Sequence, residues 1–374
     1  MPWAYSITKF IFHCSSVRAT IAKSISRCHY LQFAIGGLFG DWASVAATVA
    51  HKQGRAYAIH TDRVEHQVIL QVTRSARLLT RLKAKIIAPI IASYHRWIVK
   101  NCALGLFHGS DCYEAYSPFC HNSHLIHNVH IKPRDAIDAS VLAAKVHGVQ
   151  TDRTIRICYA GRMEMMKAPM DWVRAISTAQ NLGVNLHATW MGDGTLKDEM
   201  KALIASLGLD STIELSGFEP NRERLLQKIR ESHLMLFTHV TPESPRCLLE
   251  ALACGTPIVG YQSKYCEELI KDFGGGMFVP VNDWKQLGEL ISTLSRDRPL
   301  LQRLIEAASI NGTRFNDEAV FKHRSKLIEK YLTLNSVLPS QESNEVYFTF
   351  RGSIKVNSLT STTSIKPFAV DKVL

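Results

Sequence analysis

Apolar positions in the second half of the chain alternate between short continuous runs and stripes with helical spacing. Short apolar runs bounded by glycine indicate buried strands, and the stripes that follow indicate helices. Because strands and helices alternate, this half predicts a Rossmann-like domain with a parallel sheet. The predicted strands are 155–160, 186–191, 212–215, 234–237, 258–260 and 277–279, and the predicted helices are 171–182, 197–207, 222–231 and 283–294.

The pattern is most informative in the stretch 241–260, which is typical of a loop, a helix and a strand. Ser244 is placed to cap the helix, and Pro245 to occupy its first turn, where no backbone donor is needed. Gly255 stands where a left-handed residue ends a helix. The start of such a helix offers free N–H groups and a partial positive charge, so the stretch predicts a seat for a phosphate.

Two carboxylates accompany this phosphate seat, with Glu243 just before the helix and Glu250 within it. A carboxylate accepts hydrogen bonds from two neighbouring hydroxyls, as a ribose presents them. The combination predicts a ligand that carries both phosphates and hydroxyls, which is a nucleotide-sugar.

Loops after other predicted strands carry glycines and cations. Gly161 and Arg162 follow one strand, with Lys167 shortly after, and the next strand ends in Gly192, Asp193 and Gly194. Glycine lets the backbone approach a ligand closely, while arginine and lysine neutralise a diphosphate. No dinucleotide fingerprint or Walker loop follows a strand, so those nucleotide-binding folds are disfavoured.

The first half predicts a less regular α/β unit, with helices over 13–28 and 41–50 and strands over 30–35, 55–60 and 103–107. His108 follows the last of these strands, and ligands bind at the carboxyl ends of strands in open α/β sheets. Its imidazole could contact a sugar hydroxyl or stabilise charge at the reacting carbon. A purely structural hydrogen bond is the alternative, and the sequence leaves both open.

The segment 74–100 is helical in pattern, with an expected break at Pro89, and contains no acidic residue. Its arginines and lysines alternate with leucine, isoleucine and tryptophan. One interpretation is a pair of surface helices with a solvated basic face. The other is a helix that docks on an anionic membrane surface or a charged acceptor.

Histidine recurs at every third position from 121 to 130, beside Cys112 and Cys120. This spacing matches no common zinc pattern, so a strand and loop are favoured over a metal site. The polar segment 132–154 is expected to link two domains. The segment 335–374 loses periodicity and is expected to be a mostly disordered tail.

Composition narrows the class and the compartment. The chain has 374 residues, 46% of them hydrophobic, and a formal net charge of +11, which favours anionic partners. No apolar run is long enough to cross a membrane, and no aromatic-basic platform for nucleic acid is evident. Nine cysteines without a Cys-x-x-Cys spacing indicate a reducing compartment. We therefore expect a cytoplasmic protein, either free or peripheral on the inner face of a membrane; the acid-free start also fits a transit peptide, the disfavoured alternative.

The glycine and cation loops, together with the block PESPRCLLEALACGTPIV from Pro242 to Val259, resemble a retaining glycosyltransferase of family 4. The resemblance is strong over 155–330 and weaker before it. It implies the α/β GT-B architecture, in which two Rossmann-like domains face each other across a cleft. The expected division is 1–150 for a shortened acceptor-side domain with its linker, 151–316 for the nucleotide-sugar domain, 317–334 for a helix crossing back, and 335–374 for the tail.

The resemblance also implies roles for single residues. Arg162 and Lys167 would neutralise the donor diphosphate, Glu250 would hold the ribose, and Glu243 would contact the transferred sugar. His108 is the other catalytic candidate. The loop and the helix start would donate backbone N–H groups to phosphate and sugar, through Ser244, Pro245, Arg246, Cys247 and Leu248.

Three positions depart from the family's pattern. Glu243 and Glu250 are one position closer together than the usual pair, and Ala168 replaces the glycine that usually follows the diphosphate lysine. In addition, no glycine-rich loop precedes Gly36, although the family begins with a strand, such a loop and a helix.

The resulting hypothesis is a metal-independent transfer of a sugar from a UDP- or GDP-sugar to a glycan, lipid-linked or small-molecule acceptor. Similar enzymes are thought to use a front-face mechanism without a protein nucleophile. Two alternatives remain: a non-catalytic relative that only binds the sugar-nucleotide, and a sugar-nucleotide epimerase of the same architecture. No cofactor is expected, and nucleic acid is not an expected partner.

Overall fold

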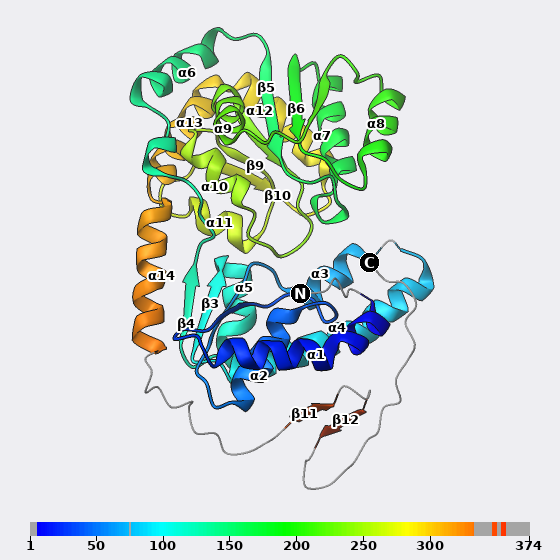
Figure 1. Cartoon of the computed structure of the whole chain (residues 1–374). Helices are drawn as coiled ribbons and strands as arrows, with labels where there is room; N and C mark the ends of the chain where they lie inside the picture. Colours follow the sequence, from blue (N-terminus) through cyan, green and yellow to red (C-terminus); the bar gives the residue numbers. More distant parts are fainter. Residues whose placement is uncertain (1–5, 75, 333–345, 350–352, 357–374) are drawn as a thin grey trace. The chain divides into compact units, whose positions relative to one another are not determined.

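The computed structural model describes residues 6–74, 76–332, 346–349 and 353–356 and contains two parallel β-sheets, each in a unit of its own (Figure 1). The first unit holds residues up to His108, then Cys112–Ile126 and the chain from His323 onward. The second unit holds Gly109–Asp111 and His127–Lys322. The expected α/β class is confirmed, with a parallel sheet in each unit.

The first unit contains a four-stranded sheet whose spatial order, β1-β2-β3-β4, is also its order along the chain. Every neighbouring pair is parallel. Because the order never reverses, this sheet has no topological switch point, where α/β sheets usually bind ligands. Its elements are α1 Ile7–Ile25, β1 Gln32–Ala34, α2 Trp42–Lys52, β2 Ala58–Thr61, α3 Glu65–Val72, α4 Leu78–Lys100, β3 Leu104–His108, α5 Gly109–Tyr116, η1 Ser117–Phe119 and β4 Ser123–Ile126.

Local sequence explains how this unit starts. The strand β1 leads through a loop containing Gly36 and Gly37 into α2, so a strand, a glycine loop and a helix do follow one another, but only after α1. The carboxylate of Asp41 caps α2 by accepting from the amides of Ala43 and Ser44. It also accepts from the Gly36 amide at 2.9 Å, which ties the loop to the helix start.

The second unit contains a six-stranded sheet in the order β10-β9-β8-β5-β6-β7. The chain starts in the middle at β5, builds outward to β7, and returns to β8 on the other side. The border between β5 and β8 is therefore a switch point, where a crevice forms at the carboxyl ends of the strands. The strands are β5 Ile155–Ala160, β6 Leu186–Met191, β7 Ile213–Gly217, β8 Leu234–Phe237, β9 Ile258–Tyr261 and β10 Gly276–Val279.

Helices cover both faces of this sheet and bury a large apolar core. Strands β5, β6 and β8 begin and end where the apolar runs predict. Helices α11 Lys264–Ile270 and α13 Arg298–Thr313 were not predicted. The start of α13 does carry the expected signals, since Asp297 caps it and proline occupies its first turn. The other helices are α6 Ala139–Thr151, α7 Pro169–Asn181, α8 Lys197–Ser206, α9 Arg222–Glu231, α10 Arg246–Ala253 and α12 Trp284–Arg296, with short 3-10 turns η2 Pro133–Asp135 and η3 Met165–Lys167.

Two local expectations were wrong. Helix α4 continues through Pro89 instead of breaking there. Proline removes one backbone donor, but Ala88, Ile91 and Ala92 next to it are buried, and we attribute the unbroken helix to this packing. Helix α10 begins at Arg246, with Pro245 rather than Ser244 at its N-cap and no side-chain hydrogen bond there.

Residues 127–150, between the two sheets, belong to the second unit, whereas the expected division at residue 150 placed them with the first domain. Val129, Ile131 and Val149 belong to the core of the second unit, so 127–150 is part of that unit rather than a linker. Helix α14 Asp317–Tyr331 starts in the second unit, and its Leu327 packs in the first unit's small core with Leu104. Most of the predicted tail lies outside the described residues; within it, β11 Val346–Thr349 pairs antiparallel with β12 Ser353–Val356.

Neither a membrane span nor a metal cluster is found in the described part of the chain. No helix there is both long and apolar enough to cross a bilayer. No group of three or more His, Cys, Asp or Glu residues there could hold a metal. The repeated histidines have separate neighbours instead: His124 lies against Tyr331, while His127 pairs with Glu268.

Candidate functional site

Several of the predicted site residues lie in loops at the switch point of the second unit. The loop after β5 begins with Gly161, and the loop after β6 begins with Gly192. These two loops touch: a Cβ at Gly192 would lie 2.0 Å from the Gly161 carbonyl oxygen, and one at Gly194 would lie 2.5 Å from the Met163 carbonyl oxygen. Glycine is therefore required for the two loops to pack together, independently of any ligand.

Lys167 and Glu243, predicted from distant parts of the sequence, meet beside this switch point. The Lys167 ammonium donates to Glu243 Oε1 at 2.7 Å, and both side chains are nearly buried, at 11% and 12% exposed. The hydroxyl of Thr241 donates to the same carboxylate oxygen at 3.3 Å. The loop after β8 thus holds a carboxylate against the cation expected to neutralise a diphosphate.

His239 stands behind this pair and was not predicted. It lies just after β8, and its imidazole Nε2 is 2.6 Å from the Tyr159 hydroxyl, while its Nδ1 is 3.7 Å from Glu243 Oε1. Burial, and then the charge of Lys167, hold the pKa of His239 well below its ordinary value. A neutral ring that accepts from Tyr159 carries its proton on Nδ1, facing Glu243. The sequence signal that could have revealed His239 is its position just after the predicted strand 234–237.

The other two predicted charged residues of this region, Arg162 and Asp193, differ in their interactions. Arg162 is exposed and makes no ion pair with any residue of the described chain. Asp193 is exposed, binds Lys197 at 2.9 Å, and accepts from the Gly194 amide at 2.9 Å. Arg162 thus projects an unneutralised cation, as a phosphate ligand should, whereas Asp193 mainly fixes its own loop.

The start of α10 offers fewer free donors than expected. The Leu248 amide already donates to the Pro245 carbonyl at 3.3 Å. Cys247 and Leu248 are buried side chains of the core, so only their backbone could face a ligand. Burial raises the pKa of the Cys247 thiol to about 12, which keeps it protonated and unreactive.

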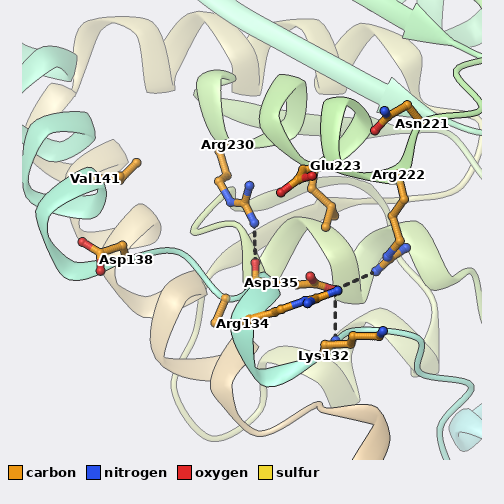
Figure 2. Close-up of a pocket in the computed structure, with 11 residues that line it drawn as sticks. Lys132, Arg134, Asp135, Asp138, Val141, Asn221, Arg222, Glu223 and Arg230 are labelled. Atoms are coloured by element: carbon orange, nitrogen blue, oxygen red, sulfur yellow. Dashed lines mark hydrogen bonds and ion pairs between the residues drawn. The ribbon is translucent and has the colours of Figure 1, made fainter.

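Glu250 is held by an arginine that the sequence did not indicate. Arg222, at the start of α9, donates from Nη1 to Glu250 Oε1 at 2.8 Å and from Nη2 to Asp135 Oδ2 at 3.4 Å. Asp135 is itself fixed by the Lys132 amide at 3.0 Å, and its carbonyl by Arg230 at 2.7 Å (Figure 2). Lys132, Asp135, Arg222 and Arg230 line a cavity of about 500 Å³.

His108 lies in the first unit, unlike the other site residues. It is 2% exposed at the end of β3, and its ring centroid is 5.5 Å from that of His60. Burial, then Arg324, lowers the pKa of His60 to about 4, so His60 is neutral at physiological pH. The site residues of the second unit are Gly161, Arg162, Lys167, Gly192, Asp193, Gly194, Glu243, Ser244, Pro245, Arg246, Cys247, Leu248 and Glu250.

Residues 144–310, which include the switch point and all of these loops, match the family model for glycosyl transferases group 1. Over these residues, a little under half of the chain, the protein is similar to group 1 glycosyltransferases. The suspected family resemblance is thereby confirmed at the level of the group.

Relatives of this chain align with it over parts of their length. An amylovoran biosynthesis glycosyltransferase of Erwinia amylovora is 25% identical over 47% of this chain and 45% of its own. A Campylobacter jejuni N-acetylgalactosaminyltransferase, named for a diphospho-undecaprenol acceptor, is 25% identical over 54% of this chain and 56% of its own. An exopolysaccharide phosphotransferase of Streptomyces coelicolor is 32% identical over 39% of this chain but only 16% of its own. The chain thus spans about half, or less, of these relatives.

Solved structures extend the likeness beyond the glycosyltransferase domain. The Anabaena protein HepE, solved with UDP, aligns with a TM-score of 0.61 at 16% identity, over 83% of this chain and 82% of its own. Sucrose-phosphate synthase of Thermosynechococcus elongatus aligns with a TM-score of 0.62 at 15% identity, over 87% and 77%. At such identities the likeness establishes the fold, which is of the GT-B type.

Proposed function

We propose that this chain is a retaining glycosyltransferase that moves a sugar from a UDP- or GDP-sugar to a glycan, lipid-linked or small-molecule acceptor. The observation that carries the proposal is the meeting of Lys167 and Glu243 beside the switch point, with the exposed Arg162 on the same loop as Lys167. Two cations suit a diphosphate, and a carboxylate suits sugar hydroxyls. The names of the relatives, which include several polysaccharide glycosyltransferases, support a role in polysaccharide biosynthesis.

In this proposal Arg162 and Lys167 bind the donor diphosphate, and Glu250 binds the ribose. The bond between the anomeric carbon and the phosphate oxygen breaks, and the acceptor oxygen bonds to that carbon from the same face. The acceptor's proton passes to the departing phosphate oxygen. The cations stabilise the negative charge that develops on the leaving diphosphate, which is the main source of rate acceleration.

Lys167 would share its charge between the diphosphate and Glu243. The pair at 2.7 Å keeps the ammonium fixed before the donor arrives, so little reorganisation is needed. Glu243 would then accept hydrogen bonds from the transferred sugar, with the neutral His239 ring supporting it from behind. His108, the other catalytic candidate, would act on the acceptor side.

The proposal also includes independence from metal ions, because side-chain cations would take the charge of the leaving group. A thermal-shift screen of UDP-, GDP- and ADP-sugars should identify the donor, and transfer by the purified protein should then proceed unchanged in EDTA. Tight binding of the donor without transfer to any acceptor tested would contradict the enzymatic proposal and leave a binding function.

A non-catalytic, sugar-nucleotide-binding role is the second candidate, and one observation favours it. The first unit's sheet runs in chain order without a switch point, so it lacks the usual ligand crevice on the expected acceptor side. A lipid-linked acceptor would instead bring the protein to a cytoplasmic membrane surface.

A further inference from the structure

The N-terminal half of α4 has a second apolar stripe on the side that faces away from its own unit. Leu78, Leu79, Leu82 and Ile86 are 67%, 74%, 48% and 57% exposed. At about 100° per residue, these four positions fall within an arc of about 100°. The buried positions of the helix, such as Ala84, Ala88 and Ile91, fall on the opposite side. The helix is thus apolar on two faces, and only one of them packs in the unit.

Cations border this outward stripe on both sides. Arg81 and Lys85 lie along one edge and Lys83 along the other, and Arg77 stands at the helix start. None of these four is paired in a salt bridge within the described chain. The stripe ends at Pro89, beyond which the outward positions are Ser93 and Arg96. The docking face is therefore the span 77–86, and not the whole basic segment.

We propose that this face, Arg77 to Ile86, binds the surface of an anionic lipid bilayer. Exposed leucines between long basic side chains can enter the boundary between headgroups and acyl chains while the cations remain at the phosphates. The chain contains no acidic residue between Glu65 and Asp111, so no acidic side chain of this segment weakens the attraction to anionic lipid.

A second copy of the chain is the competing occupant, and its electrostatics are unfavourable. Two such faces brought together would place Arg81, Lys83 and Lys85 of one copy against the same residues of the other. No acidic side chain of this segment could offset that repulsion. An anionic membrane satisfies both the apolar stripe and its basic borders. This proposal goes beyond the transfer reaction and does not depend on the donor site.

The test is sedimentation of the full chain with vesicles of phosphatidylcholine, alone or with roughly one-third phosphatidylglycerol. Binding should require phosphatidylglycerol and weaken as salt rises. The combined variant Leu78→Ser, Leu79→Ser, Leu82→Ser and Ile86→Ser should lower the partition coefficient at least about tenfold. The variant Arg81→Gln, Lys83→Gln and Lys85→Gln should lower it by a similar factor and flatten the salt dependence.

Matched controls change exposed residues of the same type in the second unit. Leu182→Ser, Leu207→Ser and Ile310→Ser should leave vesicle binding intact, as should Lys201→Gln, Lys271→Gln and Arg303→Gln. The proposal is overturned if the wild type does not bind phosphatidylglycerol vesicles, or if the variants of α4 bind as well as the controls. It is also overturned if the serine variant only abolishes self-association, measured by sedimentation velocity without lipid. Donor binding should be unchanged in every variant, which separates this outcome from failure of the proposed reaction.

Discussion

Lys167 and Glu243 form a nearly buried ion pair at 2.7 Å beside the switch point of the second sheet. They come from loops after different strands, β5 and β8, which adjoin in the sheet although they are far apart in sequence. The topology of the sheet thus brings together a cation suited to phosphate and a carboxylate suited to a sugar.

Removing the lysine should abolish most transfer. Lys167→Ala is expected to lower kcat by about 100- to 1000-fold, because a preorganised cation at the leaving group is lost. It also leaves Glu243 as an unpaired, nearly buried charge, which destabilises the fold by about 3–5 kcal/mol. Transfer kinetics and thermal melts measure the two effects separately, and Lys201→Ala on the exposed face of α8 is the control.

The double variant Lys167→Met, Glu243→Gln distinguishes chemistry from folding. It removes both charges, so stability should largely return while transfer remains lost. Near-normal transfer in the folded double variant would show that the pair is structural only.

Arg222 should act by positioning Glu250. Its guanidinium fixes one carboxylate oxygen at 2.8 Å, which leaves the other oxygen for a ribose hydroxyl. Arg222→Ala is expected to weaken binding of UDP by about 3- to 10-fold, which corresponds to the loss of roughly one ordinary hydrogen bond from a misplaced Glu250. Arg222→Lys should recover part of it, and Arg224→Ala on the same helix should change nothing.

A chemical comparison makes the positioning role specific. Wild-type protein should prefer UDP over its 2′-deoxy analogue, because Glu250 binds the ribose hydroxyls. In Arg222→Ala this preference should shrink. An equal preference in both proteins, measured by calorimetry, would show that Arg222 does not orient Glu250.

Ala168 occupies a position that glycine would fill better. Its φ of 43° and ψ of 58° are left-handed, and it ends η3 and starts α7. A left-handed alanine costs about 1–2 kcal/mol, while glycine loses more entropy on folding. Ala168→Gly should therefore raise the free energy of unfolding by up to about 1 kcal/mol. The opposite sign is expected for Ala143→Gly, which lies in the exposed part of helix α6. Denaturant melts that rank the two variants the other way would contradict this reading.

Acid should destabilise the first unit through His95. Burial lowers the pKa of His95 to about 4 from its ordinary 6.5, and its Nδ1 is 3.2 Å from the Tyr116 hydroxyl. Below pH 6.5 the unfolded chain binds a proton at His95, whereas the folded chain does not until the pH approaches 4. The contribution of neutral His95 to the free energy of unfolding is therefore complete above pH 6.5. At most about 3 kcal/mol of it is lost as the pH falls toward 4.

His95→Gln should flatten this dependence, although His60 and His233, whose pKa values are also lowered to about 4, keep part of the slope. His187→Gln, at an exposed position of β6, is the matched control. Unfolding free energies measured between pH 7 and 4 decide the matter. A slope that is the same for wild type and His95→Gln would count against the buried neutral ring.

The second unit was largely predictable because its strands are continuous apolar runs, and β5 and β6 are each followed directly by glycine. β5, β6 and β8 match the predicted bounds. The block around Glu250 also carried the family signal. In contrast, Arg222 and His239 were missed because their roles depend on partners distant in sequence, Glu250 and Tyr159.

The first unit was harder to predict, also for physical reasons. β1 spans only Gln32–Ala34, too short for a clear alternation. Pro89 suggested a break that packing overrides. The outward stripe of α4 was hidden in the sequence, since Leu78 and Ile91 look alike until the structure exposes one and buries the other.

Calorimetric titration of the full chain with UDP- and GDP-sugars tests the proposed donor site most directly. The same titrations are made on Arg162→Ala, Lys167→Met, Glu250→Ala and the control Lys201→Ala. We expect one class of nucleotide-sugar to bind the wild type and the control equally. Each of the three site variants should bind it at least about tenfold more weakly, the loss of one charge-assisted contact. Undiminished binding in all three folded variants would contradict a donor site at the switch point of the second sheet.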